Sequence, residues 1–108
     1  MGRLPLTVDP DQENAFLVGV QFKTRRGWDA HDTLDELALL ADTAGAKVAD
    51  RMICHLISIH PATFIGKGKA AQIAEKVQET HATTVIFDEE LSPVQSRKLE
   101  DLFGVKVI

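Results

Sequence analysis

Apolar runs of strand length alternate with amphipathic helical stretches along almost the whole chain, and this alternation is the strongest constraint on its fold. The apolar run at 15–20 is unbroken, and further β-leaning stretches occupy 48–59, 84–87 and 105–108. Between these runs, apolar residues recur at the three- and four-residue spacing of a buried helix face. The order β-α-β-α-β-α-β predicts an α/β fold, with a four-stranded, mostly parallel sheet and helices on both faces.

Local signals predict where the first two helices begin and end. Thr33 and Glu36 have the spacing of a capping box, which predicts a helix start at Thr33, and Gly45 supplies the left-handed residue that ends the helix. Pro61 should close the strand stretch at 48–59, because proline cannot donate a ladder hydrogen bond. The apolar stripe from Ala70 to Val77 marks the second helix.

The third helix carries the clearest terminal signals. Ser92 is a good N-cap, Pro93 follows at the first helical position, and Gln95 completes a capping box. Gly104 should end this helix, and 105–108 begins a fourth strand. That strand ends at the last residue of the chain without a polar tail, which suggests that the polypeptide continues in a longer protein.

The chain is of a length that suits one domain. We expect 1–14, a polar stretch without periodicity, to be a flexible lead-in, and 15–108 to form a single α/β domain. The 108 residues are 44% hydrophobic and 26% charged, as in an ordinary soluble protein. No apolar run approaches the ~18 residues of a membrane span, and no signal peptide is recognisable. The single cysteine, Cys54, fits a reducing compartment, so we expect a cytoplasmic protein.

Three loops should meet at the carboxyl edge of the sheet, where open parallel sheets bind their ligands. They are Lys23–Trp28, Pro61–Lys69 and Asp88–Glu90. The acidic third loop could hold a metal ion, but acidic residues before a helix also complement its dipole, and we expect no metal site.

The second loop contains a Gly-Lys-Gly-Lys sequence. Gly66 and Gly68 permit a close backbone approach, and Lys67 and Lys69 could present ammonium groups to a phosphate at the start of the second helix. The alternative is a flexible, solvated lead-in to that helix.

The first loop adds further basic and aromatic groups. Arg25 and Arg26 could contact RNA or nucleotide phosphates at the same edge, and Trp28 could stack on a base. The formal net charge of −4 argues against a nucleic-acid site that covers the whole surface, so any such site should be local.

No catalytic constellation is recognisable in the sequence, and we expect this chain not to be an enzyme by itself. The Gly-Lys-Gly-Lys loop lacks the Gly-x-x-x-x-Gly-Lys-Ser/Thr pattern of a P-loop. Two Asp-x-x-Gly sequences, 42–45 and 101–104, are explained as helix ends. A guanine-reading Asn-Lys-x-Asp is excluded because the only asparagine, Asn14, precedes an alanine. The four histidines lie in different elements without metal-ligand spacing.

Three segments together resemble the N-terminal domain of the HflX family of ribosome-associated GTPases. They are the helical segment 34–48, the Pro-Ala-Thr-Phe-Ile-Gly-Lys-Gly-Lys loop at 61–69, and the stretch from Val85 to Ile108 with its Phe-Asp-Glu-Glu-Leu-Ser-Pro sequence. The resemblance covers the chain from about Ala15 to its end, in the order and spacing of the family.

This resemblance implies a binding domain that precedes a helical hairpin and a GTPase domain, both absent from this chain. The implied partners are the large ribosomal subunit with its rRNA and the protein's own GTPase domain, and the implied role is in dissociating or rescuing ribosomes. GTP and Mg²⁺ are expected in the missing GTPase domain, whereas this part of the protein should need no cofactor. The alternatives are ATP or another nucleotide bound at the carboxyl edge, and a regulatory domain that packs on the GTPase domain.

Overall fold

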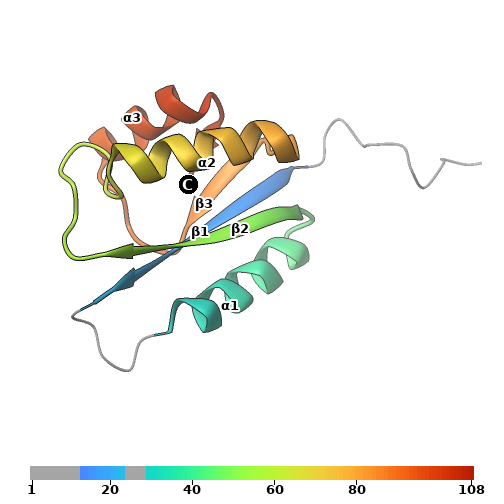
Figure 1. Ribbon diagram of the computed structural model, residues 1–108. Helices are drawn as coiled ribbons and strands as arrows, with labels where there is room; N and C mark the ends of the chain where they lie inside the picture. Colours follow the sequence, from blue (N-terminus) through green and yellow to red (C-terminus); the bar gives the residue numbers. More distant parts are fainter. Residues whose placement is uncertain (1–12, 24–28) are drawn as a thin grey trace, which may run out of the picture.

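The computed structural model describes 13–23 and 29–108, and it contains the expected alternation of strands and helices (Figure 1). The strands are β1 (Asn14–Phe22), β2 (Lys47–Leu56), β3 (Thr84–Phe87) and β4 (Lys106–Val107). The helices are α1 (Ala30–Thr43), α2 (Lys67–Thr80) and α3 (Pro93–Phe103). The predicted element order and fold class are confirmed.

The described strands form one parallel sheet in the order β2-β1-β3-β4. β1 lies in the interior of the sheet, between β2 and β3, because its apolar run can be buried on both faces. Ala15, Phe16, Leu17 and Val18 are all buried. The chain leaves β1 to one side for β2 and returns on the other side for β3, so the carboxyl end of β1 is the topological switch point of the sheet.

Helices cover the two faces of the sheet unequally. α2 and α3 lie together on one face, and α1 lies on the other (Figure 1). Because side chains alternate along a strand, Phe16 and Val18 enter the core under α2 and α3, whereas Ala15 and Leu17 pack with Leu34 of α1. The predicted helices on both faces are confirmed.

The start of α1 corrects one prediction. The capping box at Thr33 and Glu36 does not form, because the helix begins at Ala30 with Asp29 as N-cap. The Asp29 carboxylate accepts a hydrogen bond from the His31 amide, and the Thr33 hydroxyl lies inside the first turn, 3.4 Å from the Asp29 carbonyl oxygen. The buried Ala30 belongs to the face that packs on the sheet, so the helix extends one turn further toward its N-terminus.

Other element ends follow the local signals more closely. Ser92 and Gln95 form the predicted capping box of α3, with Pro93 next to the cap. Gly45 and Gly104 adopt φ values of +90° and +74° after their helices, as predicted. α2 begins at Lys67, before the apolar stripe that predicted it, and so Gly68 lies inside the helix.

β2 is shorter at its carboxyl end than the predicted stretch of 48–59. It ends at Leu56, opposite Phe22, where β1, its only partner among the described strands, also ends. The Lys23 amide donates the last cross-strand bond, to the Leu56 carbonyl oxygen at 3.1 Å. Beyond this point Ile57 and Ile59 lie beside none of the strands in 13–23 and 29–108, and their side chains are exposed.

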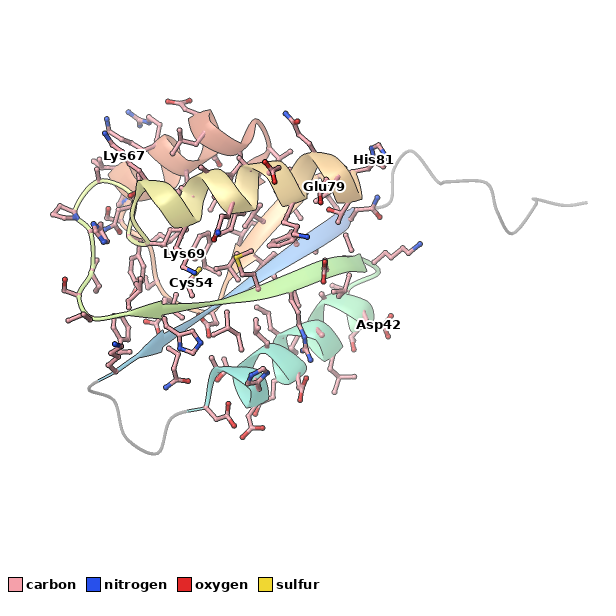
Figure 2. All side chains as sticks on the ribbon, viewed as in Figure 1. Asp42, Cys54, Lys67, Lys69, Glu79 and His81 are labelled. Carbon is pink, nitrogen blue, oxygen red and sulfur yellow. The ribbon has the colours of Figure 1, made fainter. Side chains whose placement is uncertain are left out.

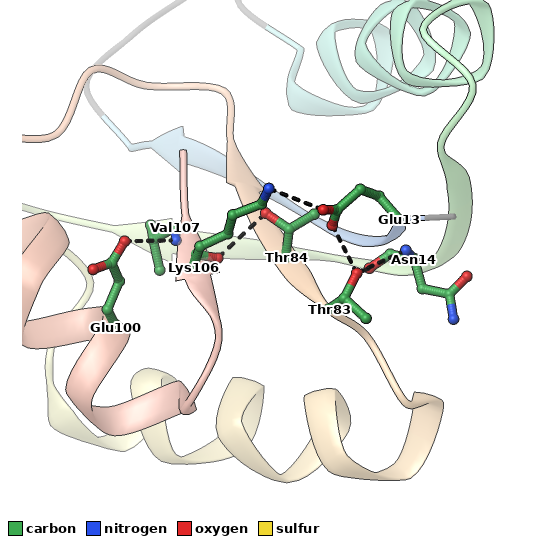
Figure 3. Close-up of polar contacts among 7 residues, drawn as sticks. All are labelled: Glu13, Asn14, Thr83, Thr84, Glu100, Lys106 and Val107. Carbon is green, nitrogen blue, oxygen red and sulfur yellow. Dashed lines mark hydrogen bonds and ion pairs between the residues drawn. The ribbon is translucent and has the colours of Figure 1, made fainter. Parts of the chain in front are cut away.

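The amino edge of the sheet is tied together by polar contacts (Figure 3). The Glu13 carboxylate accepts from the Thr83 hydroxyl at 2.8 Å and pairs with the Lys106 ammonium at 2.9 Å. The Asn14 amide donates to the Thr83 hydroxyl, and the Val107 amide donates to the Glu100 carboxylate. These contacts fix the short edge strand β4 to the start of β1 and to α3.

Candidate phosphate-binding edge

The loop between β2 and α2 folds back on itself by backbone hydrogen bonds. The amides of His60 and Phe64 each donate to the other residue's carbonyl oxygen, at 2.9 and 2.8 Å. Phe64 has a φ of +65°, a conformation that costs a non-glycine residue about 1–2 kcal/mol. Its ring is buried, and the centroid of this ring lies 6.5 Å from that of the Phe22 ring. Burial of the Phe64 ring offsets the backbone cost. The loop is therefore closed by two backbone hydrogen bonds and packed through the Phe64 ring.

A side chain from α3 anchors this loop. Gln95 is 8% exposed, and its Nε2 donates to the His60 carbonyl oxygen at 3.2 Å while its Oε1 accepts from the Ser92 amide. One side chain thus completes the α3 capping box and holds the β2–α2 loop, 35 residues away in sequence. Sequence reasoning identified the capping box but missed this second contact, for which the sequence contains no local signal.

Gly66 joins the loop to α2 and is fixed there by its conformation. Its φ is +84°, and a β-carbon at this position would lie 3.0 Å from the His60 Nε2. Asp29 caps α1 and Ser92 caps α3, but no described side chain caps α2. The amides of its first turn therefore face the loop without a capping acceptor, at the positive end of the helix dipole.

A pocket of about 740 Å³ opens at this helix start. Its described lining contains two lysines, Lys67 and Lys69, and no aspartate or glutamate. Lys67 is exposed, whereas Lys69 is half-buried and lies close to Cys54 (Figure 2). The remaining lining residues are His55, Leu56, Ile57, Ser58, His60, Ile65, Gly66, Gly68 and Gln72. The pocket therefore combines two ammonium groups, helix amides and an apolar wall.

The loop after β3 also reaches the carboxyl edge. The Asp88 carboxylate accepts from the Val20 amide at 3.0 Å, and the Asp88 amide donates to the Val18 carbonyl oxygen at 3.0 Å. Asp88 thereby extends the pairing of β1 and β3 at the switch point, a structural role for the first residue of the acidic loop. Across 13–23 and 29–108, no cluster of three or more His, Cys, Asp or Glu is arranged to hold a metal ion.

Arg25, Arg26 and Trp28 lie outside the described residues. The second loop does bring Gly66, Lys67, Gly68 and Lys69 together at the mouth of one pocket, with His60 as a neighbour that sequence reasoning left unassigned. Four of the six positions predicted to contact phosphate therefore line this pocket, and their contact with phosphate stays a prediction.

Cys54 faces the α2 side of the sheet and is fully buried. Burial raises the pKa of its thiol, the nearby Lys69 ammonium opposes that increase, and the Asp88 carboxylate adds to it. Because the thiolate is the reactive form, this cysteine is a poor nucleophile.

None of the described helices is both long and apolar enough to cross a bilayer.

Comparison with known proteins gives a consistent result. The protein-family model described as GTP-binding GTPase N-terminal matches residues 31–108. The chain is 42% identical over 97 residues to the GTPase HflX of Lacrimispora saccharolytica and 40% identical over 96 residues to that of Escherichia coli K12. These matches cover 90% and 89% of this chain but only 22% of either relative. A third GTPase HflX, from Flavobacterium psychrophilum, is 31% identical over 96 residues, which are 89% of this chain and 23% of the relative.

Proposed function

This chain belongs to the HflX family of GTPases, as its N-terminal domain, and we propose that it serves there as a binding module for the rRNA of the large ribosomal subunit. The chain spans about a fifth of the length of its relatives, so a role in ribosome dissociation or rescue belongs to the longer protein and is part of this proposal. In that protein, GTP and Mg²⁺ bind to the GTPase domain, and the protein acts in the cytoplasm.

One observation carries the proposal: among the described residues, the pocket at the start of α2 is lined by two lysines and no carboxylate. Phosphate groups supply most of the affinity of proteins for nucleic acids, and ammonium groups and helix amides are their usual partners. The exposed Ile57, which also lines the pocket, adds an apolar surface on which a ribose or base can rest. Arg25, Arg26 and Trp28, in the β1–α1 loop, would extend the same contact.

The net charge of −4 is compatible with such a local site. Steering of an anion depends on the charges near the site, because exposed charges more than about 8 Å away are largely screened at physiological salt. The pocket is therefore expected to attract phosphate although the domain as a whole is acidic.

The test is binding of the full-length protein to purified large ribosomal subunits, measured by co-sedimentation. Substitution of Lys67→Ala together with Lys69→Ala should weaken binding roughly tenfold, which corresponds to about 1.4 kcal/mol. Lys47→Ala together with Lys76→Ala is the matched control, because it removes the same charge from residues that do not line the pocket. Equal affinity of the two double variants would reject the proposed site.

A nucleotide is the second candidate ligand, since the pocket volume lies in the usual range of small-molecule sites. ATP would place its phosphates at the α2 amides and its base on the apolar wall. Calorimetric titration of the 108-residue chain with millimolar ATP distinguishes the two. Heat that is lost in the Lys67→Ala, Lys69→Ala variant supports the nucleotide, and an absence of heat and of any thermal shift removes it.

A further inference from the structure

A second pocket lies between α2 and α3, which pack side by side on one face of the sheet (Figure 1). Its volume is about 720 Å³. The buried Ile73 and Leu99 mark the sides of the two helices that face the core, so the pocket opens on the outer side. α2 lines it with Lys67, Ala71 and Ala74, and α3 lines it with Lys98, Asp101 and Leu102. We call this surface the α2–α3 groove.

The middle of the α2–α3 groove is apolar. Ala71 and Ala74 are small, so they leave space between the helices, and Leu102, which is 51% exposed, lines the same space. From Lys67 to Ala74 the groove runs about 10 Å along α2, at about 1.5 Å per residue. An apolar cleft of this kind suits a flat aromatic group such as a nucleobase.

Two charged groups of α3 stand at the groove without a described partner. Lys98 and Asp101 have the same i, i+3 spacing as Lys76 and Glu79 of α2, which pair at 3.6 Å. Within 13–23 and 29–108, however, no ion pair or side-chain hydrogen bond involves Lys98 or Asp101. Together with Lys67, the groove therefore presents two ammonium groups and one carboxylate to a ligand.

Lys67 connects the groove to the phosphate pocket, because it lines both. An RNA strand with one phosphate at the start of α2 therefore continues past Lys67 into the groove. The mixed charge restricts the occupant. Asp101 repels a purely anionic ligand, whereas a nucleotide has phosphates for the lysines and base N–H groups for the carboxylate.

We propose that the α2–α3 groove binds an unpaired guanine of the RNA strand whose neighbouring phosphate lies in the pocket at the start of α2. The inference rests on the proposed function, in which that strand is rRNA. Guanine fits because its N1–H and 2-amino groups are adjacent donors, and both can bind the carboxylate of Asp101. Uracil has a single N–H between two carbonyl oxygens, which the carboxylate repels. Lys98 contacts the phosphate that follows the guanine.

The guanine must be unpaired for this contact. In a duplex, the edge of the base that carries these donors is already paired, and the base is stacked between its neighbours. The groove therefore distinguishes a single strand from a duplex, whereas the phosphate pocket binds a group that both contain.

Fluorescence anisotropy with labelled RNA decamers tests the proposal. Each decamer is oligouridine with a guanosine, an inosine or a uridine at one central position, and each is titrated with the 108-residue chain. The guanosine decamer should bind at least about fivefold more tightly than the uridine decamer, as expected for a bidentate contact to a base. Inosine lacks the 2-amino group, so its decamer should have an intermediate affinity. Annealing the guanosine decamer to its complement should remove the advantage.

Two substitutions at exposed positions separate base recognition from phosphate binding. Asp101→Asn should abolish the preference for guanosine, because the amide has one acceptor where the carboxylate has two. Asp42→Asn is the matched control, since it removes an exposed carboxylate of α1 that does not line the groove. Both variants should bind the uridine decamer equally. Ala71→Leu, which fills the groove, should also abolish the preference.

Four results would overturn the proposal. They are equal affinity for the guanosine and uridine decamers, a preference that survives in Asp101→Asn, no binding of any decamer, and a preference that is absent from the full-length protein. The last result would show that another part of the protein occupies the groove.

Failure of the proposed function gives a different pattern. If all decamers bind equally but Lys67→Ala together with Lys69→Ala weakens them, only the guanine site is rejected. If this double variant binds the decamers and the large ribosomal subunit as the parent does, the phosphate site itself is rejected.

Discussion

Gln95 joins the start of α3 to the loop that shapes the phosphate pocket, and its removal should weaken both. Gln95→Ala deletes an acceptor for the Ser92 amide and a donor to the His60 carbonyl oxygen. A neutral hydrogen bond contributes about 0.5–1.5 kcal/mol, and a buried group left without its partner costs about 1–3 kcal/mol. We therefore expect a loss of about 2 kcal/mol in the free energy of unfolding. For a domain of this size, each kcal/mol lowers Tm by about 4–8 °C.

The variant Q95E separates the two hydrogen bonds. Its carboxylate still accepts from the Ser92 amide but faces the His60 carbonyl oxygen with no proton to donate. The nearby His60 carbonyl oxygen should raise the folded-state pKa of the new carboxyl group, because only the protonated form can donate a hydrogen bond to it. The stability deficit should therefore be smallest below the ordinary glutamate value of about 4.3 and should grow as the pH rises through the raised folded-state value.

Urea denaturation followed by circular dichroism, repeated across this pH range, measures both effects. Gln78→Ala, at an exposed position of α2, is the matched control and should change stability little. An unchanged free energy of unfolding for Gln95→Ala, or a Q95E deficit that does not depend on pH, would refute the reasoning that Gln95 anchors the loop.

Three further predictions follow from single contacts. Gly19→Ala should lower the free energy of unfolding, measured by urea denaturation, by about 1–3 kcal/mol, because the new β-carbon would lie 2.9 Å from Cγ of the buried Leu34. When Gly19→Ala is combined with Leu34→Ala, the loss in this free energy should be smaller than the sum of the two single losses. Strict additivity would contradict the clash. The Lys106 hydrogen bond lowers the pKa of Glu13, so this pair should stabilise the fold above the ordinary pKa of the carboxyl group and lose its effect as the pH falls through the lowered value. In urea denaturation, Glu13→Gln should lower the free energy of unfolding by at most about 1 kcal/mol at neutral pH, and this loss should vanish in acid. A loss that does not change with pH would exclude the pair as its source. Burial raises the pKa of Cys54, so a thiol reagent at neutral pH should modify it only at the rate of unfolding, whereas rapid reaction of the native chain would show that the thiol is accessible.

The sequence predicted those features of the fold that depend on a few adjacent residues. The α3 capping box at Ser92 and Gln95 and the helix end at Gly104 depend on backbone conformation and contacts within one turn, and they were correct. The start of α1 was wrong because two cap patterns overlap there, and the choice of Asp29 over Thr33 depends on the burial of Ala30 against the sheet.

Features that depend on distant partners were harder to predict. The end of β2 is set by the length of β1, since an edge strand without a partner has no ladder to extend. Lys67 and Lys69 could be assigned to a common site because the carboxyl edge of a parallel sheet is a general ligand-binding position. The contact of Gln95 with His60 could not be predicted from the sequence, because it depends on how α3 is placed relative to the β2–α2 loop.

The salt dependence of ribosome binding tests the central claim most directly. The logarithm of the association constant falls linearly with the logarithm of salt concentration, by about 0.7–0.9 for each phosphate contact. If Lys67 and Lys69 each contact a phosphate, Lys67→Ala together with Lys69→Ala should reduce this slope by about 1.4–1.8, and Lys47→Ala together with Lys76→Ala should leave it unchanged. Parallel lines for the parent and the Lys67→Ala, Lys69→Ala variant would contradict the assignment of this pocket to rRNA.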